Sequence, residues 1–529
     1  MLNKKIISLS ICIVLLGAMF SGCVEERADE VKIEVPQELN IALGAGIGGL
    51  DPHGSLSGDA RIIWANIYET LVYLDENMQV QPRLATSWEV SDDAKVWIFH
   101  LRENVKFHDN TPFNAEAVQF TFERHIKENP FAVGVKIQNI EVIDDYIIKF
   151  HLKEPFVPFL SELTRTRSSI ISPTSVITNE FKPVGTGPFK FEEWIKEEKI
   201  VLSQNENYWG GAQPLSKIIF KIIPDAHTRV MAFDAGKIDI IGIGRGDIPP
   251  EKITRLKNDP QVTFKSKLSM NTVWLALNQE NEFLQDLKVR KAINYAINPK
   301  SILEHVIEGF GEVAVAPWSP TQMFGKAPGL ELPDYNPAKS QRLLTESGWI
   351  DANGDGILDK DGTPFKITLI IENRHPWRGI AEVVQSQLRN IGIDMELIEL
   401  ERGAFSKLLR ERDFDISGIS GRGLPSNDPY MHISNFYHSK YGFRIGEKAP
   451  NPSLINNPEL DALIEKSISV VCPEERKNMY HRMQEIIINE SVGVYLYHSL
   501  RVTALQENVK GFEISGGFWN LCLRGVRLE

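Results

Sequence analysis

The stretch Leu268-Ser-Met-Asn-Thr-Val-Trp-Leu-Ala-Leu-Asn278 lies at the middle of the chain, and the rest of the sequence is organised around it. Its core, residues 272–277, is apolar and partly β-branched and has an asparagine on either side, which is typical of a buried β-strand. A helical pattern follows at residues 283–296 and stops before Pro299. The segments before and after this strand each have the character of a folding unit, so we expect the strand to cross between two lobes.

Length and charge narrow the class of protein. A chain of 529 residues is longer than one ordinary core supports, so two or three domains are expected. The net charge of −12 argues against a nucleic-acid partner, which would require a basic surface. The sequence contains no HExxH, GxSxG or P-loop motif, which leaves an enzymatic role without positive support.

The N-terminus has the proportions of a signal peptide. Lys4 and Lys5 precede an apolar run over residues 6–20, and small residues then lead to Cys23. This boundary resembles a lipoprotein cleavage site, so we predict a signal at residues 1–23, a lipidated Cys23 and a tether at residues 24–38. The alternative is an uncleaved anchor helix. Either way, the body is expected to work outside the cytoplasmic membrane, where Cys472 and Cys522 could pair, although their spacing does not decide this.

The two halves of the body show different patterns. The first half is β-rich, with strands expected at residues 39–43, 96–101 and 146–152 and helices at 59–71 and 115–126. In the second half strands alternate with helices, which predicts a parallel sheet. These elements are expected at residues 366–372, 378–391, 395–400, 403–412 and 414–419. Ligands of open α/β sheets lie beyond the carboxyl ends of the strands, so residues 421–429 are a predicted pocket wall.

Several long motifs resemble one family. They are LATSWEVSDDAKVWIFHLRENVKFHDNTPFNAEAV from Leu84, VGTGPFKFEEW from Val184, VRKAINYAINPKSI from Val289 and YNPAKSQRLLTESGW from Tyr335. In this order they are similar to the extracytoplasmic solute-binding proteins for dipeptides, oligopeptides and nickel, which serve ABC importers. The resemblance extends from about Leu39 to the C-terminus.

The resemblance implies an α/β, two-lobed, periplasmic-binding-protein-like fold with an extra β-rich subdomain in lobe I. Lobe I would comprise residues 39–267 and 505–529, with the subdomain inserted at about 72–183. Lobe II would comprise residues 268–504, including both crossing segments, of which residues 494–504 are the return. The chain would be a monomeric, non-enzymatic receptor that captures a small ligand between the lobes and delivers it to the permease. No resident cofactor is implied.

The same resemblance indicates which residues contact the ligand. Peptide-binding members use an Asp in the pocket loop, but here that position is Pro425 or a neighbour, and Arg422 stands nearby. Arginine forms bidentate bonds with carboxylates, so this departure favours an anionic ligand such as a metal chelate. Arg167 falls where nickel-type members place a chelate-binding arginine, and Arg61 lies on a helix that faces the cleft. The alternative for each is an ordinary solvated arginine.

Two metal signals remain. His432 and His438 follow the pocket loop, close to where nickel-type members place a metal-binding histidine, and imidazole suits Ni(II). Ordinary surface or capping histidines are the alternative. Separately, four residues match the start of an EF-hand loop, which predicts either structural calcium or a simple turn, because Gly362 replaces the expected Glu. These four are Asp351, Asn353, Asp355 and Asp359.

Two ligand hypotheses therefore stay open. The first is a nickel or other metal chelate, with arginines on its carboxylates and a histidine on the metal. The second is a di- or oligopeptide held through backbone hydrogen bonds. An extracellular peptide hydrolase and a chemosensory adaptor are functional alternatives from different classes.

Overall fold

The computed structural model describes residues 37–54, 59–128, 137–177, 180–244, 247–420, 426–440, 451–514 and 521–529. The chain divides into two units, Met1–Pro36 and Gln37–Glu529, and all described residues belong to the second. The predicted signal segment with Cys23, and Arg422 in the pocket loop, lie outside the described residues. None of the helices formed by the described residues combines the length and apolar character that a membrane crossing requires.

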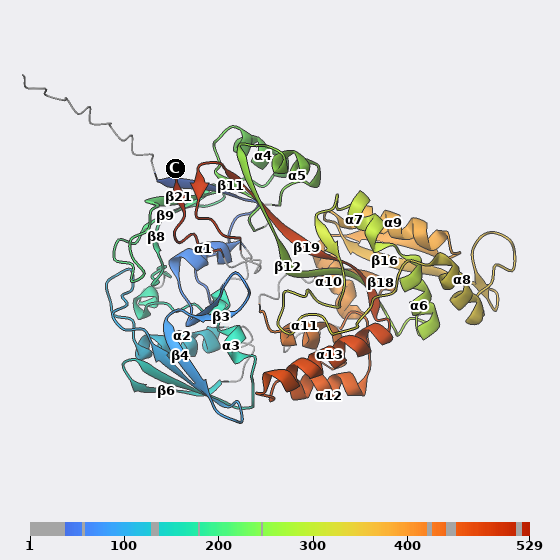
Figure 1. Ribbon diagram of the computed structural model, residues 1–529, viewed down its shortest axis with the longest axis horizontal. Helices are drawn as coiled ribbons and strands as arrows, with labels where there is room; N and C mark the ends of the chain where they lie inside the picture. The colour runs from blue at the N-terminus through green and yellow to red at the C-terminus, as the bar shows by residue number, and fades with distance from the viewer. Residues whose placement is uncertain are drawn as a thin grey trace, which may run out of the picture. The chain divides into compact units, whose positions relative to one another are not determined.

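Two long antiparallel strands form the centre of the fold (Figure 1). Strand β12 (Val262–Leu277) pairs with β19 (Gly493–Gln506) along nearly its whole length. The predicted central strand is thus confirmed, but it begins earlier than expected. The part after Leu268 is buried and the part before it is half-exposed, so only the buried part carried a clear hydrophobic signal.

These two strands join two half-sheets into one sheet of eleven strands in the described chain. On one side β1 lies parallel to β10 and β11, while β9 and β8 continue antiparallel. On the other side β16, β17 and β18 are parallel, as predicted, although β18 pairs antiparallel with β12. The strands are β1 (Glu38–Leu43), β8 (Phe189–Ile195), β9 (Lys199–Gln204), β10 (Lys217–Ile222), β11 (Ile240–Ile241), β13 (Gly311–Val313), β16 (Lys366–Glu372), β17 (Asp394–Leu400) and β18 (Ile416–Ser420).

The β-rich segment of the first half forms a separate antiparallel sheet. Its order is β4 (Ala85–Val90), β5 (Val96–Leu101), β7 (Ile147–Leu152), β6 (Ile137–Asp144), and α2 (Ala115–Glu128) packs on it. Asn114 accepts the backbone N–H of Ala117 and so caps α2, as its position predicts. Edge-to-face contacts of Phe99, Phe122 and Phe159 with Phe150 fill the space between the layers.

The remaining helices and strands are also divided between the first and second halves of the chain. The described first half also contains α1 (Ala60–Ile67), β2 (Val72–Leu74), β3 (Val80–Pro82), α3 (Phe159–Glu162), α4 (Ala226–Asp234), α5 (Pro250–Lys257) and 3-10 helices at Thr166–Ser168 and Pro173–Val176. The second half contains α6 (Leu287–Ala296), α7 (Pro299–His305), α8 (Pro337–Glu346), β14 (Asp359–Lys360), β15 (Thr363–Pro364), α9 (Trp377–Arg389), α10 (Arg402–Glu411), α11 (Tyr430–Tyr437), α12 (Pro458–Ser467) and α13 (Pro473–Asn489). The chain ends with β20 (Val509–Lys510) and β21 (Arg527–Leu528).

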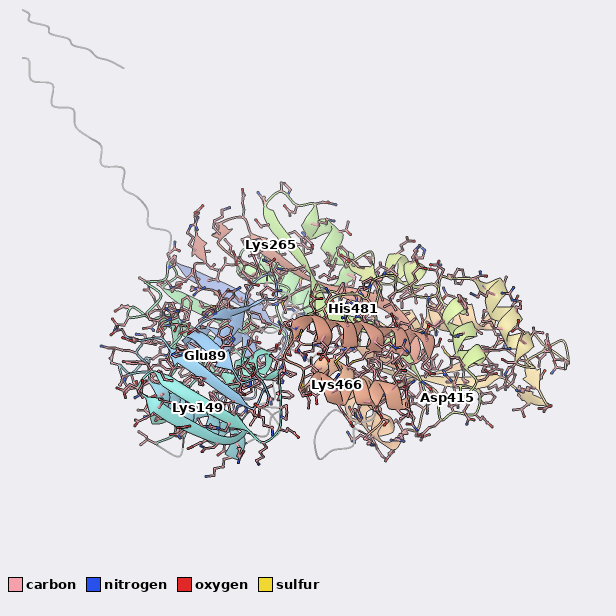
Figure 2. All side chains as sticks on the ribbon, turned by 60° about the horizontal axis from the view of Figure 1, so that its bottom comes forward. Glu89, Lys149, Lys265, Asp415, Lys466 and His481 are labelled. Carbon is pink, nitrogen blue, oxygen red and sulfur yellow. The ribbon has the colours of Figure 1, made fainter. Side chains whose placement is uncertain are left out.

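Local capping explains one shifted boundary. The helix expected from residue 283 begins at Leu287, because the Asp286 side chain accepts the backbone N–H of Lys288 and starts the helix there. Phe283 instead stacks on Phe365, at a ring-centroid distance of 5.3 Å. Nearby, Asp415 (labelled in Figure 2) accepts hydrogen bonds from the backbone and hydroxyl of Thr368, which holds β16 beside the start of β18.

Separate hydrophobic cores lie on the two sides of the crossing strands. We call the side with β1 and β8–β11 lobe I, and the side with β16–β18 lobe II. The lobe I core includes Leu39, Trp64 and, from the chain end, Leu523. The lobe II core includes Ile293 and Trp377. The residue boundaries given above for the lobes stay a prediction.

Candidate ligand-binding site

Described residues of the first half contact residues that follow β18 at several places. The Asn427 side chain donates to the Met78 carbonyl at 2.9 Å, and the Val157 backbone N–H donates to the Ile468 carbonyl at 2.7 Å. The rings of Phe156 and Tyr430 pack edge-on at 5.5 Å. Residues 78–157 of the first half therefore contact residues 427–468 of the second half in this structure.

A group of three arginines lies at this junction. Arg61 comes from α1. Arg165 lies just before the 3-10 helix that follows α3, and Arg167 lies within that helix. We call these three residues the arginine group. Burial lowers the pKa of Arg61 to about 9, and the positive charges of Arg165 and Arg167 contribute to the decrease. Arg165 pairs with Glu162. The pKa of Glu162 is raised by burial, and the Asp428 carboxylate of lobe II adds to this, which locates the group at the lobe junction.

Two stacked histidines lie beside the arginine group. The rings of His53 and His125 are 4.6 Å apart and nearly parallel. Arg124 donates to Nδ1 of His53 at 2.9 Å, so the other ring nitrogen carries the proton and donates to the Ser169 carbonyl at 3.2 Å. Burial lowers the pKa of His53 to about 4 and that of His125 to about 2, and Arg167 contributes to both shifts. Both rings are therefore neutral at pH 7.

A cavity of about 360 Å³ lies next to the same segment. Its wall includes Ala65, one turn after Arg61, together with Thr164 and Thr166, which alternate with the arginines. Glu69 also lines it, but this buried carboxylate already accepts four hydrogen bonds. The donors are Arg83 at 3.1 Å, Thr186 at 3.0 Å, Tyr208 at 2.8 Å and Trp209 at 2.7 Å. This lining carboxylate is therefore already satisfied by the protein.

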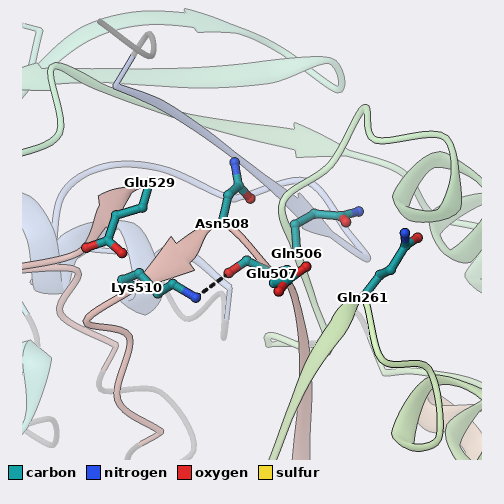
Figure 3. A pocket seen from close by; sticks show the side chains of 6 residues that line it. All are labelled: Gln261, Gln506, Glu507, Asn508, Lys510 and Glu529. Atoms are coloured by element: carbon teal, nitrogen blue, oxygen red, sulfur yellow. Dashed lines mark hydrogen bonds between the residues drawn. The ribbon is translucent and has the colours of Figure 1, made fainter. Parts of the chain in front are cut away.

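A second hollow, of about 440 Å³, lies where β19 ends (Figure 3). Its lining is polar, and the Lys510 ammonium donates to the Glu507 carbonyl at 2.7 Å. It shares no lining residue with the cavity beside the arginine group. Its lining residues are Gln261, Gln506, Glu507, Asn508, Lys510 and Glu529.

The predicted histidines are engaged within lobe II. His432 is fully buried among Trp318, Phe436 and Tyr437, and burial lowers its pKa to about 3. His438 accepts the backbone N–H of Lys440 at 3.0 Å, and its other nitrogen lies 3.2 Å from a Glu465 oxygen. The structure thus brings Arg61 and Arg167 together, whereas these contacts of the two histidines lie inside lobe II.

The predicted calcium loop is closed by its own hydrogen bonds. The Asp351 carboxylate accepts the backbone N–H groups of Gly354 and Gly356 at 2.8 and 3.0 Å. Asn353 accepts from the backbone of Asp355, whose carboxylate accepts from Ile357. Asp359 begins β14. In the part of the chain that the structure describes, no three His, Cys, Asp or Glu side chains are placed to hold a metal ion. Calcium binding stays a prediction.

Sequence reasoning missed two members of the site. Arg165 was not assigned a role beside Arg167, although the alternation of Arg and Thr there was a usable signal. His125 lies in the last turn of the amphipathic helix α2, where a histidine carries no signal of its own. Cys472 and Cys522, which the sequence left open as a pair, are both free thiols.

The crossing strands, the separate cores and the arginine group at the lobe junction define a two-lobed ligand-binding protein. More particularly, the chain belongs to the bacterial extracellular solute-binding proteins of family 5, whose middle-region model matches residues 79–443. It is therefore an extracellular or periplasmic transport receptor rather than an enzyme.

Individual relatives agree in fold and differ in ligand. The nickel-binding periplasmic protein of Escherichia coli is 29% identical over 492 residues, covering 90% of this chain and 92% of that protein. The crystal structure of NikA from Brucella suis with Fe(III)-EDTA is 28% identical and superimposes with a TM-score of 0.84, covering 93% and 100% of the two chains. DppA from Helicobacter pylori, in complex with the peptide STSA, is also 28% identical, with a TM-score of 0.75 over 93% and 98%. These matches confirm the two-lobed α/β fold.

Proposed function

We propose that this protein captures an anionic, carboxylate-bearing ligand, a chelate of nickel or another metal, between its lobes and delivers it to an ABC permease. The observation that carries the proposal is the arginine group at the lobe junction. Three guanidinium groups lie close together here, and the pKa of Arg61 is lowered first by burial and then by repulsion from Arg165 and Arg167. An anion bound among them would relieve that repulsion.

The chemistry of arginine fits this ligand class. Its planar fork forms bidentate hydrogen bonds with carboxylates, and such charged bonds are stronger than neutral ones. Arg61 and Arg167 would hold carboxylates, and Arg422 would join them from the pocket loop. A ligand that contacts both lobes stabilises the closed arrangement by its differential affinity for it.

Relatives support the chelate without deciding it. One is a nickel-binding protein, and another was crystallised with Fe(III)-EDTA, an anionic chelate. For the metal itself, His438 or His432 would be a ligand, but each would first have to leave its present neighbours. Direct contact between the protein and the metal is therefore a weaker part of the proposal than carboxylate recognition.

A peptide is the second candidate, favoured by a different observation. The cavity beside α1 is lined by the acidic residues Asp75, Glu76 and Glu513 in addition to Glu69. Carboxylates at its wall suit the α-ammonium of a peptide, and the relative from Helicobacter pylori binds one. In this case the arginine group would receive the opposite, carboxylate end.

The location of the receptor forms part of the proposal. Cleavage before Cys23 and lipidation of that residue would anchor the body to the outer face of the cytoplasmic membrane, next to the permease. Mass spectrometry of membrane-derived protein would detect the lipid on the new N-terminal cysteine. An intact N-terminus would replace this with the anchor-helix alternative.

Calorimetry on the purified full chain tests the ligand class. Fe(III)-EDTA and nickel–histidine represent chelates, and the peptide STSA represents peptides. Heat of binding from a chelate alone is the expected result. Heat from the peptide alone would reject the chelate proposal in favour of the second candidate.

A further inference from the structure

His125 is a buried polar side chain whose hydrogen-bonding capacity is unused. The residue is 0% exposed, and within the described residues neither ring nitrogen has a hydrogen-bond partner. Buried polar side chains nearly always have a protein, water or ligand partner. Among the described residues the ring therefore has no hydrogen-bond partner, and a bound ligand could supply one.

The ring is held rigidly in this state. It stacks on His53 at 4.6 Å, and His53 is itself fixed through both of its nitrogens, to Arg124 and to the Ser169 carbonyl. One turn earlier on α2, the Thr121 hydroxyl accepts the backbone N–H of Ile171 at 3.2 Å, which ties the helix to the segment after Arg167. A rigid, unsatisfied donor is the arrangement expected of a binding residue.

The surroundings of His125 indicate what it would bind. Burial is the main cause that keeps its pKa near 2, and after His53 the next contributions come from Arg167 and Arg165. The ring is therefore neutral and offers one N–H donor beside two cationic groups. An anion attracted by those arginines would come within reach of that donor.

We propose that His125 is a ligand-contacting residue, donating a neutral hydrogen bond to the carboxylate that Arg165 and Arg167 hold. This inference rests on the proposed anionic ligand and adds a contact from the subdomain helix α2. It also assigns a purpose to the His53 stack, which positions the His125 ring.

Two variants of the full chain test the contact, with Fe(III)-EDTA as the probe in calorimetry. His125→Phe keeps a ring on His53 but removes the donor, and we expect about 10- to 100-fold weaker binding. His125→Gln keeps a neutral N–H and should recover part of that loss. The loss should be the same at pH 6 and pH 8, because the ring does not change charge in this range. The exposed His100→Gln on β5 is the control, expected to bind like the wild type.

The possible outcomes distinguish a failure of this inference from a failure of the proposed anionic ligand. Unchanged affinity in His125→Phe, with an unchanged or raised melting temperature, would overturn the inference and identify a histidine satisfied by internal water. If the wild type bound no anionic probe at all, the proposed function and this inference would fall together.

Discussion

Two arginines, the half-buried Arg61 in lobe I and the buried Arg476 in lobe II, have opposite electrostatic surroundings. Arg476 makes a bidentate pair with Asp428, at 2.7 and 3.1 Å, and also contacts the Tyr480 hydroxyl at 3.0 Å. Burial alone would lower its pKa, but Asp428 and Tyr480 outweigh burial and raise it. Around Arg61, burial and two further arginines both act to lower the pKa.

The difference separates a structural arginine from a binding one. The Arg476 network is complete and anchors the Asp-Pro turn of the pocket loop to α13, so it positions the wall of the site. In the arginine group, the positive charges of Arg165 and Arg167 disfavour the charged form of Arg61, and a bound anion would offset this repulsion. Ionisable groups in a cleft whose pKa values are shifted are candidates for a functional role for this reason.

The largest expected effect is the loss of the complete network. Arg476→Met leaves the Asp428 carboxylate buried without its cation, which should lower the free energy of unfolding by about 3–5 kcal/mol. Urea unfolding followed by tryptophan fluorescence measures it. Arg482→Met is the matched control on the same helix: its pairs with Glu459 and Glu485 are exposed, and such pairs contribute little. Equal effects of the two substitutions would contradict the distinction between buried and exposed pairs.

The second effect separates binding from stability. Arg61→Met removes one cation of the arginine group while keeping a long side chain, so we expect Fe(III)-EDTA to bind at least about 10-fold more weakly, as for a lost charged hydrogen bond. The unfolding midpoint should stay the same or rise, because like-charge repulsion is relieved. A loss of stability as large as that of Arg476→Met would instead make Arg61 structural.

Much of the fold was readable from local patterns. The strand expected at residues 366–372 is β16 with the same bounds, and the helix expected at 403–412 is α10 shifted by one residue. These elements have strong periodicity and clear turn residues at their ends. The first half of β12 was missed because its half-exposed residues do not alternate clearly.

The site was less accessible to sequence reasoning. Arg61 and Arg167 were proposed separately through resemblance, but their meeting depends on how α1 packs against the segment after α3, which no local pattern encodes. The stacking of His53 on His125 joins residues from a loop and from α2, and the sequence assigned neither a role. Tertiary packing brings these residues together, and local sequence composition does not specify tertiary packing.

The smallest expected effect is on the pH dependence of the free energy of unfolding. In this respect, too, the surroundings of Arg476 differ from those of the arginine group. The hydrogen-bond partners of Arg476 include no histidine, whereas His53 lies beside the arginine group, with its pKa lowered from 6.5 to about 4, mainly by burial. Between these values the unfolded chain binds a proton at this residue that the folded chain does not. The free energy of unfolding should therefore be constant above about pH 7.5 and fall as the pH decreases through 6.5 toward 4.

For His53 alone this decrease is about 1 kcal/mol between pH 7 and pH 5.5. His53→Gln, which cannot be protonated, should show a shallower loss of stability in urea unfolding over this range, while the exposed His100→Gln should follow the wild type. Other buried histidines contribute to the wild-type curve, so the informative quantity is the difference between variant and wild type. Parallel curves for His53→Gln and the wild type would mean that His53 is protonated equally in the folded and unfolded chains, and that burial does not hold this ring neutral.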